Sequence, residues 1–198
     1  HSGFEALGRP VVWLGVVPTP FAARCLIKRG GGMAVVLTAS HNPATDNGFK
    51  LFSEGGYKLD PEDEAEIESL LAARMVEDAP KVRDSVLPLV QAPDPIDFAN
   101  EWKGPSLEGM RVALDTANGA TALFSPLVLR QLGATVFTIG DSPDGLNINS
   151  GVGSEYPENV ARLVKEHGCD IGFAHDGDGD RVIAVDHLGH VLSGEHFM

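Results

Sequence analysis

The chain has 198 residues, of which 43% are hydrophobic, and it carries 15 lysines and arginines against 28 aspartates and glutamates, a net charge of −13 at pH 7. This length allows one large domain or two small ones, and it is sufficient for a hydrophobic core without metal or disulfide support. The acidic balance argues against nucleic acid and membranes as partners, because both attract a cationic face. The two cysteines are too few for a disulfide framework, and their low number favours a location in the reducing cytoplasm.

The first part of the chain is predicted to begin with a strand–helix–strand unit. The apolar run 11–17 has the length of a buried strand, and Thr19 and Pro20 then supply an N-cap and the first position of a helix. A second apolar run, 33–39, follows the glycines at 30–32, so we expect the two strands to be parallel neighbours with a right-handed crossover. Further elements expected here are a hairpin over 48–52 and 57–59, and a helix over 62–75 that Asp60 and Pro61 cap and that carries Ile67, Leu70 and Leu71 on one face.

A proline-rich stretch marks a division between two domains, which we place at residues 1–103 and 104–198. Five prolines fall between residues 80 and 105, with a short helix expected over 96–103. The pattern of strands and helices then begins again, which predicts a second α/β unit. In chain order we expect strand 110–115, helix 120–132, strand 135–139, a polar loop over 140–154, helix 157–166, strands 170–174 and 181–185, and a helix that begins at Ser193.

Polar residues at the end of the second predicted strand form a first candidate site. The segment reads Thr38-Ala39-Ser40-His41-Asn42-Pro43, and ligand groups often gather at such strand ends in open parallel sheets. Ser40 has the chemistry of a nucleophile or phosphate carrier, and His41 and Lys50 have the chemistry to handle protons or phosphate charge. The alternative is a β-turn in which Ser40 and Asn42 hydrogen-bond to their own backbone.

An acidic loop after another predicted strand forms a second candidate site. It reads Asp176-Gly177-Asp178-Gly179-Asp180-Arg181, and alternate side chains of an extended loop face the same side. Three carboxylates that converge repel one another unless a cation lies among them, and hard oxygen ligands of this kind suit Mg²⁺ or Ca²⁺. An EF-hand is excluded, because Arg181 stands where that loop requires glycine. A solvated acidic turn is the alternative.

The remaining polar residues give weaker signals. The segment Gly145-Leu146-Asn147-Ile148-Asn149 predicts a polar loop by itself. Cys25 and Cys169 are expected to be inert core thiols. The other histidines lack metal-ligand spacing and are expected at the surface: His1, His167, His175, His187, His190 and His196.

Taken together, segments 38–43, 46–50 and 176–181 resemble the phosphoserine loop and the metal loop of the α-D-phosphohexomutase family, in their letters, order and spacing. Within that family, the pattern over 147–158 is most similar to the bacterial phosphoglucosamine mutases, although Tyr156 stands where many of them carry histidine. The resemblance covers the whole chain and corresponds to most of the first and all of the second of the four family domains. It implies that the fold is α/β, with two three-layer α/β/α domains built on mixed, mostly parallel sheets.

The resemblance also implies an activity and a set of site residues. The enzyme would interconvert glucosamine 6-phosphate and glucosamine 1-phosphate through a phosphoserine and a bisphosphate intermediate. Ser40 would carry the phosphoryl group, and His41 and Lys50 would act in proton transfer. Asn42 and Arg181 would bind the hexose phosphate substrate.

By the same resemblance, Mg²⁺ would be held by Ser40 together with Asp176, Asp178 and Asp180. The implied partners are the third and fourth domains of a longer chain, without which we expect this chain to fold but to show essentially no mutase activity, and a second copy in a homodimer. Three alternatives stay open: a phosphomannomutase/phosphoglucomutase, a Mg²⁺-dependent phosphatase with an aspartate nucleophile, and a non-catalytic metal-binding module in which Ser40 is never phosphorylated.

Overall fold

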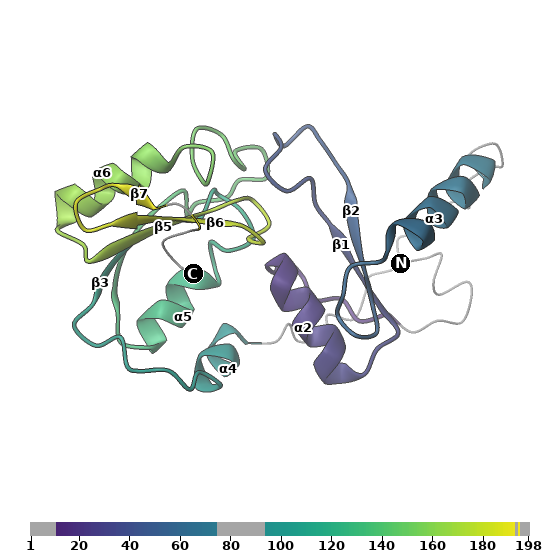
Figure 1. Cartoon of the computed structure of the whole chain (residues 1–198), viewed down its shortest axis with the longest axis horizontal. Helices are drawn as coiled ribbons and strands as arrows, with labels where there is room; N and C mark the ends of the chain where they lie inside the picture. Colours follow the sequence, from purple (N-terminus) through teal and green to yellow (C-terminus); the bar gives the residue numbers. More distant parts are fainter. Residues whose placement is uncertain (1–10, 75–93, 193, 195–198) are drawn as a thin grey trace.

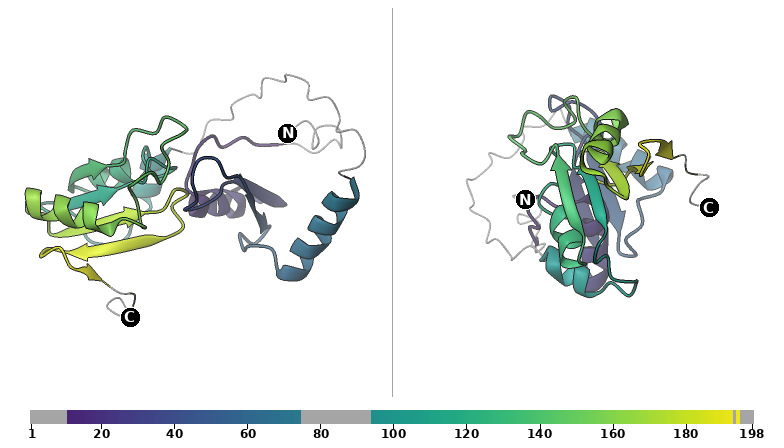
Figure 2. Two further views of the ribbon diagram at one scale, coloured as in Figure 1. Left: turned by 90° about the horizontal axis from the view of Figure 1, so that it is seen from above. Right: turned by 90° about the vertical axis from the view of Figure 1, so that its left-hand side faces the viewer.

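The computed structural model describes residues 11–74, 94–192 and 194, which form an N-terminal half (11–74) and a C-terminal half (94–192) that lie side by side (Figure 1 and Figure 2). The N-terminal half contains α2 (Thr19–Arg29), β1 (Met33–Leu37), β2 (Phe49–Ser53) and α3 (Pro61–Arg74). The C-terminal half contains α4 (Pro95–Asn100), β3 (Arg111–Asp115), α5 (Ser125–Gln131), β4 (Thr135–Ile139), α6 (Pro157–His167), β5 (Ile171–His175), β6 (Val182–Asp186) and β7 (Val191–Leu192). Among the described residues, no helix combines the length and the apolar character that a membrane crossing requires.

The C-terminal half is built on a five-stranded mixed sheet with the strand order β4-β3-β5-β6-β7. β3 pairs in parallel with both β4 and β5, whereas β6 and β7 are added antiparallel. Figure 1 shows α6 on one side of this sheet and α5 with α4 on the other. The predicted α/β class with a mixed sheet is confirmed, and each of β3 to β6 lies within one residue of its predicted position.

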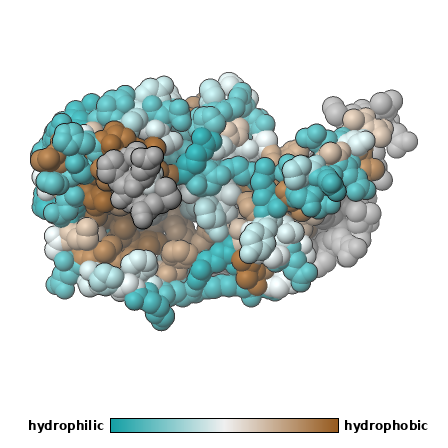
Figure 3. Space-filling view, in the orientation of Figure 1, coloured by the Kyte–Doolittle hydropathy of each residue, from teal (hydrophilic) through white to brown (hydrophobic). Residues whose placement is uncertain are grey.

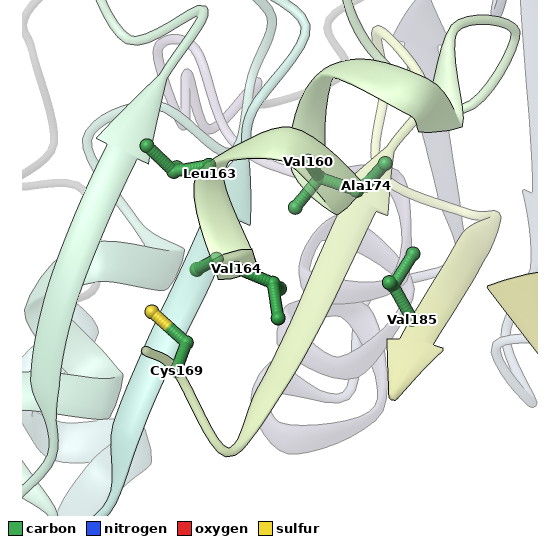
Figure 4. Packing of buried hydrophobic residues seen from close by; sticks show 7 residues of the cluster. Val160, Leu163, Val164, Cys169, Ala174 and Val185 are labelled. Carbon is green, nitrogen blue, oxygen red and sulfur yellow. The ribbon is translucent and has the colours of Figure 1, made fainter. Parts of the chain in front are cut away.

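Helix α6 supplies much of the hydrophobic core of this half (Figure 4). Its apolar residues recur at helical spacing and face the sheet. Gly172 in β5 permits the close approach, because a Cβ atom there would lie 2.7 Å from Val164 Cγ2. The buried cluster consists of Ala113, Val160, Leu163, Val164, Cys169, Ala174 and Val185. Cys25 and Cys169 are buried free thiols, as predicted, and burial raises the pKa of each.

The N-terminal half differs from the prediction in its strands. Residues 11–17, which the structure describes, form no strand: Gly15 has a φ of 73° that interrupts the extended run, and Val16 is 84% exposed. Because 11–17 forms no strand, the expected parallel strand–helix–strand unit is wrong. β1 instead pairs antiparallel with β2, with Met33 opposite Ser53. The side chains of β1 alternate between exposed and half-buried, which is the pattern of a strand covered on one face, and an apolar run alone does not reveal it.

The ends of the helices also show where local signals succeed and fail. Asp60 caps α3 as predicted, and its Oδ1 accepts hydrogen bonds from two backbone N–H groups of the first turn. The apolar face of α3 is not packed into a core within the described residues, since Leu70 and Leu71 are exposed. Thr19 is not the N-cap of α2, because Pro18 takes that position. The expected helix start at Ser193 and the proline-rich residues up to 93 lie outside the described residues.

Helix α5 begins five residues later than predicted, because residues 120–124 form turns. The turns before α5 bring Phe124 toward α2, where the two halves meet.

In the orientation of Figure 1, the hydrophobic residues at the molecular surface lie mainly on the C-terminal half (Figure 3).

Aromatic rings and ion pairs join the two halves on the side of α2 and α4. Phe21 of α2, Phe98 of α4 and Phe124 form three tilted or edge-on ring pairs, with centroids 4.7 to 6.2 Å apart. Arg24 of α2 forms a salt bridge with Glu101 and lies over the Phe98 ring. These contacts fix α2 against the C-terminal half, which places the start of α2 beside the acidic loop.

Candidate active site

Ser40 lies in a turn shortly after β1, and its backbone is in the left-handed conformation. Its φ of 56° is uncommon for a residue with a side chain. Within the turn, Thr38 Oγ1 accepts a hydrogen bond from the Ser40 N–H at 2.9 Å, and the Asn42 N–H donates to Ala39 O at 3.0 Å. These bonds are those expected for a β-turn, but the Ser40 hydroxyl is directed away from the turn toward the C-terminal half, as its partners there show.

The acidic loop follows β5 and gathers its three carboxylates. One oxygen from each of Asp176, Asp178 and Asp180 lies within 4.8 Å of the others, with Asp176 and Asp178 buried and Asp180 exposed. Asp178 Oδ1 is buried and has no hydrogen-bond partner in the described part of the chain. A set of hard oxygen atoms with one buried and unsatisfied member fits a divalent cation such as Mg²⁺.

The serine turn and the acidic loop are in direct contact. Ser40 Oγ donates to Asp176 Oδ2 at 2.8 Å, and Arg181 Nη2 donates to Ser40 Oγ at 3.1 Å. Arg181 Nη2 also lies 2.6 Å from His41 Nδ1. The Asn42 side chain instead donates to Asp46 Oδ2, at 2.9 Å, on the exposed side of the turn. The serine hydroxyl is therefore held between a buried carboxylate and a guanidinium.

Lys50 of β2 reaches the same group of carboxylates. Its Nζ donates to Asp178 Oδ2 at 2.6 Å and to Asp180 Oδ2 at 2.5 Å. Burial disfavours the ammonium, but these hydrogen bonds and the charges of the two carboxylates raise the pKa of Lys50 above its usual value. Lys50 is therefore a cation at neutral pH, and it offsets part of the negative charge of the loop.

The two buried carboxylates have pKa shifts of opposite direction. Burial raises the pKa of Asp176, and the hydrogen bond from Ser40 offsets this only in part. Burial acts in the same direction on Asp178, but hydrogen bonds from Lys50 and Thr19 hold the pKa of Asp178 below its usual value. As the pH falls, Asp176 is therefore the first of the two to take up a proton.

Two residues of this site were not assigned from the sequence. The Thr19 hydroxyl donates to Asp178 Oδ2 at 2.6 Å, and its backbone N–H donates to Asp178 O at 2.9 Å. Asn149 Nδ2 donates to the carbonyl oxygens of Ser40 and Asn42, each at 3.0 Å. Thr19 carried a helix-cap signal and Asn149 a loop signal, and neither signal indicates a partner more than 100 positions away.

His175 corrects a further expectation, because it is half-buried at the end of β5 and not a surface residue. Its Nδ1 is buried without a hydrogen-bond partner among the described residues. Burial lowers the pKa of His175, so the ring is neutral at pH 7. His175 directly follows the predicted strand 170–174, and the spacing of the histidines does not reveal that it ends an interior strand.

Comparisons with family models and with curated proteins point to the same family of enzymes. Family models described as phosphoglucomutase/phosphomannomutase, alpha/beta/alpha domains I and II, match residues 1–77 and 84–189. The chain is 44% identical over 200 residues to a phosphoglucosamine mutase of Streptococcus agalactiae, and 42% identical over 202 residues to one of Bacillus mycoides. Each match covers 100% of this chain but only 44% and 45% of the respective relatives, so the chain spans less than half of their length.

Solved structures are also similar over nearly the whole chain. A putative phosphomannomutase from Thermus thermophilus superimposes with a TM-score of 0.74 at 25% identity, over 95% of this chain and 44% of that chain. A phosphoglucomutase/phosphomannomutase family protein from Burkholderia thailandensis gives a TM-score of 0.71 at 25% identity, over 96% of this chain and 43% of that chain. The arrangement of the two halves therefore has counterparts in solved structures.

Proposed function

The chain belongs to the phosphoglucomutase/phosphomannomutase family, and from that premise we propose that it is part of an enzyme that interconverts glucosamine 6-phosphate and glucosamine 1-phosphate, with Ser40 as the phosphoryl carrier. The observation that carries this proposal is the 2.8 Å hydrogen bond from Ser40 Oγ to the buried Asp176, at the edge of three converging carboxylates. The choice of glucosamine phosphate as substrate is supported by similar curated proteins that are named phosphoglucosamine mutase.

In this proposal, the neighbours of Ser40 orient its hydroxyl and stabilise the transferring group. Asp176 accepts the serine O–H, and Arg181 takes one lone pair of the oxygen, so the second lone pair remains available to a phosphorus atom. Arg181 donates to the same oxygen, and its charge, with that of Lys50, opposes the negative charge on the phosphoryl oxygens. We assign proton transfer at the substrate to His41 and Lys50, and substrate contact to Asn42 and Arg181.

We assign Mg²⁺ to the oxygen atoms of Ser40, Asp176, Asp178 and Asp180. The buried and unpartnered Asp178 Oδ1 and the short separation of the carboxylates support this assignment. The cation would supply positive charge close to the transferring phosphoryl group. Lys50 balances the charge of Asp178 and Asp180, and Arg181 forms ion pairs with Asp176 and Asp180.

The wider assignments belong to the same proposal. We divide the chain into a first domain, 1–103, which carries the serine turn, and a second domain, 104–198, which carries the acidic loop. Further domains of a longer chain would supply contacts to the sugar and to the distal phosphate, so the chain alone should show essentially no mutase turnover. We place the protein in the cytoplasm. We also propose that a second copy of the chain is a partner, in a homodimer.

The test is transfer of a phosphoryl group to the chain. The full-length protein, in which the further domains would supply the sugar contacts, is incubated with Mg²⁺ and glucose 1,6-bisphosphate, and peptide mass spectrometry locates the phosphate. We expect it on Ser40, with none on Ser40→Ala and an unchanged level on Ser53→Ala, a control at a half-buried serine outside the site. A hydroxylamine-labile phosphate on Asp176 or Asp178 would favour an aspartate-based phosphatase, and no incorporation by a folded chain would refute the proposal. Faster removal of the Ser40 phosphate by glucosamine 6-phosphate than by glucose or mannose 6-phosphate would support the substrate assignment.

A further inference from the structure

The turn that carries Ser40 is held by a side chain from the other half of the molecule. Asn149 lies in the loop between β4 and α6, and its Nδ2 donates to the carbonyl oxygens of Ser40 and Asn42, each at 3.0 Å. The Asn149 backbone is itself anchored, because its N–H donates to Ala117 O at 2.9 Å. One amide group therefore ties two residues of the serine turn to the C-terminal half.

Ser40 requires such support because its backbone conformation is unfavourable. A φ of 56° places it in the left-handed region, which is strained for a residue with a Cβ atom and persists only where the surroundings enforce it. Thr38 Oγ1 accepts from the Ser40 N–H, and Asn149 donates to the Ser40 carbonyl. The strained residue is thus fixed on one side by its own turn and on the other side by Asn149.

Gly177 leaves the space in which this contact is made. A Cβ atom at Gly177 would lie 2.6 Å from the Ser40 carbonyl oxygen and 2.7 Å from Asn149 Nδ2, closer than real Cβ atoms come. The position lies between Asp176 and Asp178, so the serine turn, the Asn149 amide and the acidic loop pack against one another directly. The amide therefore helps to set the distance from the serine hydroxyl to the carboxylates.

We propose that Asn149 is a positioning residue, which holds the Ser40 hydroxyl against Asp176 in the geometry that accepts a phosphoryl group. The proposal rests on the proposed function, in which Ser40 is the phosphoryl carrier. Asn149 acts on carbonyl oxygens of the turn and leaves the hydroxyl to Asp176 and Arg181. A shift of the reacting atom by about 1 Å can cost on the order of 100-fold in rate, so a small movement of this turn is sufficient to be measured.

Two variants and one control separate the amide from its surroundings. Asn149→Gly removes both hydrogen bonds while tolerating the φ of 58° at this position. Asn149→Asp keeps the shape but directs an acceptor at two carbonyl oxygens. Asn159→Ala is the matched control, because Asn159, in the first turn of α6, donates from Nδ2 to Gly151 O of the same loop at 2.8 Å. Among the described residues, Asn159 makes no hydrogen bond to the serine turn.

The first measurement is hydrogen exchange followed by mass spectrometry, which does not depend on activity. We expect exchange of residues 38–43 to become about tenfold faster in Asn149→Gly and Asn149→Asp, with no change in Asn159→Ala. Residues 171–175 of β5 serve as an internal reference and should keep their wild-type rate in all three variants. The second measurement is Ser40 phosphorylation by glucose 1,6-bisphosphate. Its maximal rate should fall about tenfold in both Asn149 variants, while the half-saturating concentration stays within about twofold.

Each outcome decides the proposal. Wild-type exchange of residues 38–43 in Asn149→Gly would overturn it, and so would faster exchange that extends equally to the β5 reference, which indicates general destabilisation. Faster local exchange with an unchanged phosphorylation rate would also overturn the positioning role. If wild-type Ser40 takes up no phosphate, the proposed function fails, and the hydrogen exchange of the turn then decides separately whether Asn149 holds it.

Discussion

At the scale of single residues, the pKa of a side chain in the site depends more on its neighbours than on its chemical type. Asp176 and Asp178 are both buried aspartates two positions apart, yet their pKa values shift in opposite directions. Asp178 receives hydrogen bonds from Lys50 and from Thr19, whereas Asp176 receives a side-chain hydrogen bond from Ser40. A residue at the start of α2 therefore adjusts a carboxylate that lies 159 positions away in the sequence.

This contact gives a prediction for Thr19→Val. Valine keeps the shape of the side chain but removes the buried donor to Asp178 Oδ2, so the pKa of Asp178 should rise and the free energy of unfolding should fall by about 1–3 kcal/mol. Urea denaturation at pH 7 measures the loss. Thr121→Val is the control, because Thr121 is equally buried but its hydroxyl lies 3.5 Å from Thr116 O and should contribute less than half as much. Equal losses in the two variants would contradict the prediction.

The sequence predicted the residues that form a motif and missed those that act on it from elsewhere. Ser40, Lys50 and the aspartates lie in short runs of typical letters, and the structure brings them together. Their proposed roles stay predictions. Thr19 and Asn149 contribute through contacts between segments more than 100 positions apart, and such contacts exist only once the two halves are packed. Asn149 lies within the 147–158 pattern, but neither that pattern nor the helix-cap signal of Thr19 indicates the distant residues that these side chains contact.

Secondary structure elements were predictable where apolar periodicity and end signals agree. Helix α6 begins with Pro157 and ends before Gly168, and it lies within one residue of its predicted range. In the N-terminal half, β1 and β2 lie within two residues of their predicted ranges, but the predicted strand over 11–17 does not form. The predicted parallel pairing is wrong because an apolar run does not distinguish a buried parallel strand from a half-exposed antiparallel one. The pairing of β1 with β2 depends on where the turn over 38–48 returns the chain, which the letters leave open.

The turn between β6 and β7 gives a pH prediction at this scale. The Asp186 carboxylate accepts hydrogen bonds from the backbone N–H groups of His190, at 2.8 Å, and Leu188, at 2.9 Å, which lower the pKa of Asp186 below 3.8. A carboxyl group whose pKa is lower in the folded state stabilises the fold fully above its unfolded pKa, and this contribution is lost as the pH falls through the folded pKa.

We therefore expect backbone amides of residues 186–192 to lose protection from hydrogen exchange as the pH falls below 3.8, after correction for the intrinsic exchange rate. Amides of β3 should keep their protection over the same range. Asp186→Asn has no titrating group at this position and should remove the pH dependence of the turn. A turn that titrates identically in wild type and in Asp186→Asn would show that another group is responsible.

On the scale of the whole molecule, the described parts of the two halves are in contact at two places. The serine turn and Lys50 meet the acidic loop at one, and Phe21, Phe98 and Phe124 meet at the other. The salt bridges to Glu101 beside the aromatic rings are exposed, and exposed ion pairs contribute about 0–1 kcal/mol. The aromatic contact, which buries Phe21 almost completely, is therefore the stronger of the two types of contact beside α2.

Phe21→Ala should weaken the coupling between the halves. Truncation of a buried phenylalanine costs about 3–5 kcal/mol, and here that loss falls on the junction. We expect wild-type protein to unfold in one transition and Phe21→Ala to unfold in two, with β2 losing protection at lower urea than β5 in hydrogen-exchange experiments. Phe49→Ala, at a residue that is 60% exposed, should change stability by less than about 1 kcal/mol and keep a single transition. One shared transition in Phe21→Ala would contradict this view of the junction.

The left-handed backbone at Ser40 determines which hydroxyl amino acid this turn can carry. Threonine offers the same oxygen atom on the same carbon, but its β-branched side chain is poorly compatible with a φ of 56°. The restriction comes from the shape of the peptide chain and would apply equally if the hydroxyl took no part in a reaction. The turn thus selects serine over threonine by conformation, before reactivity has any influence.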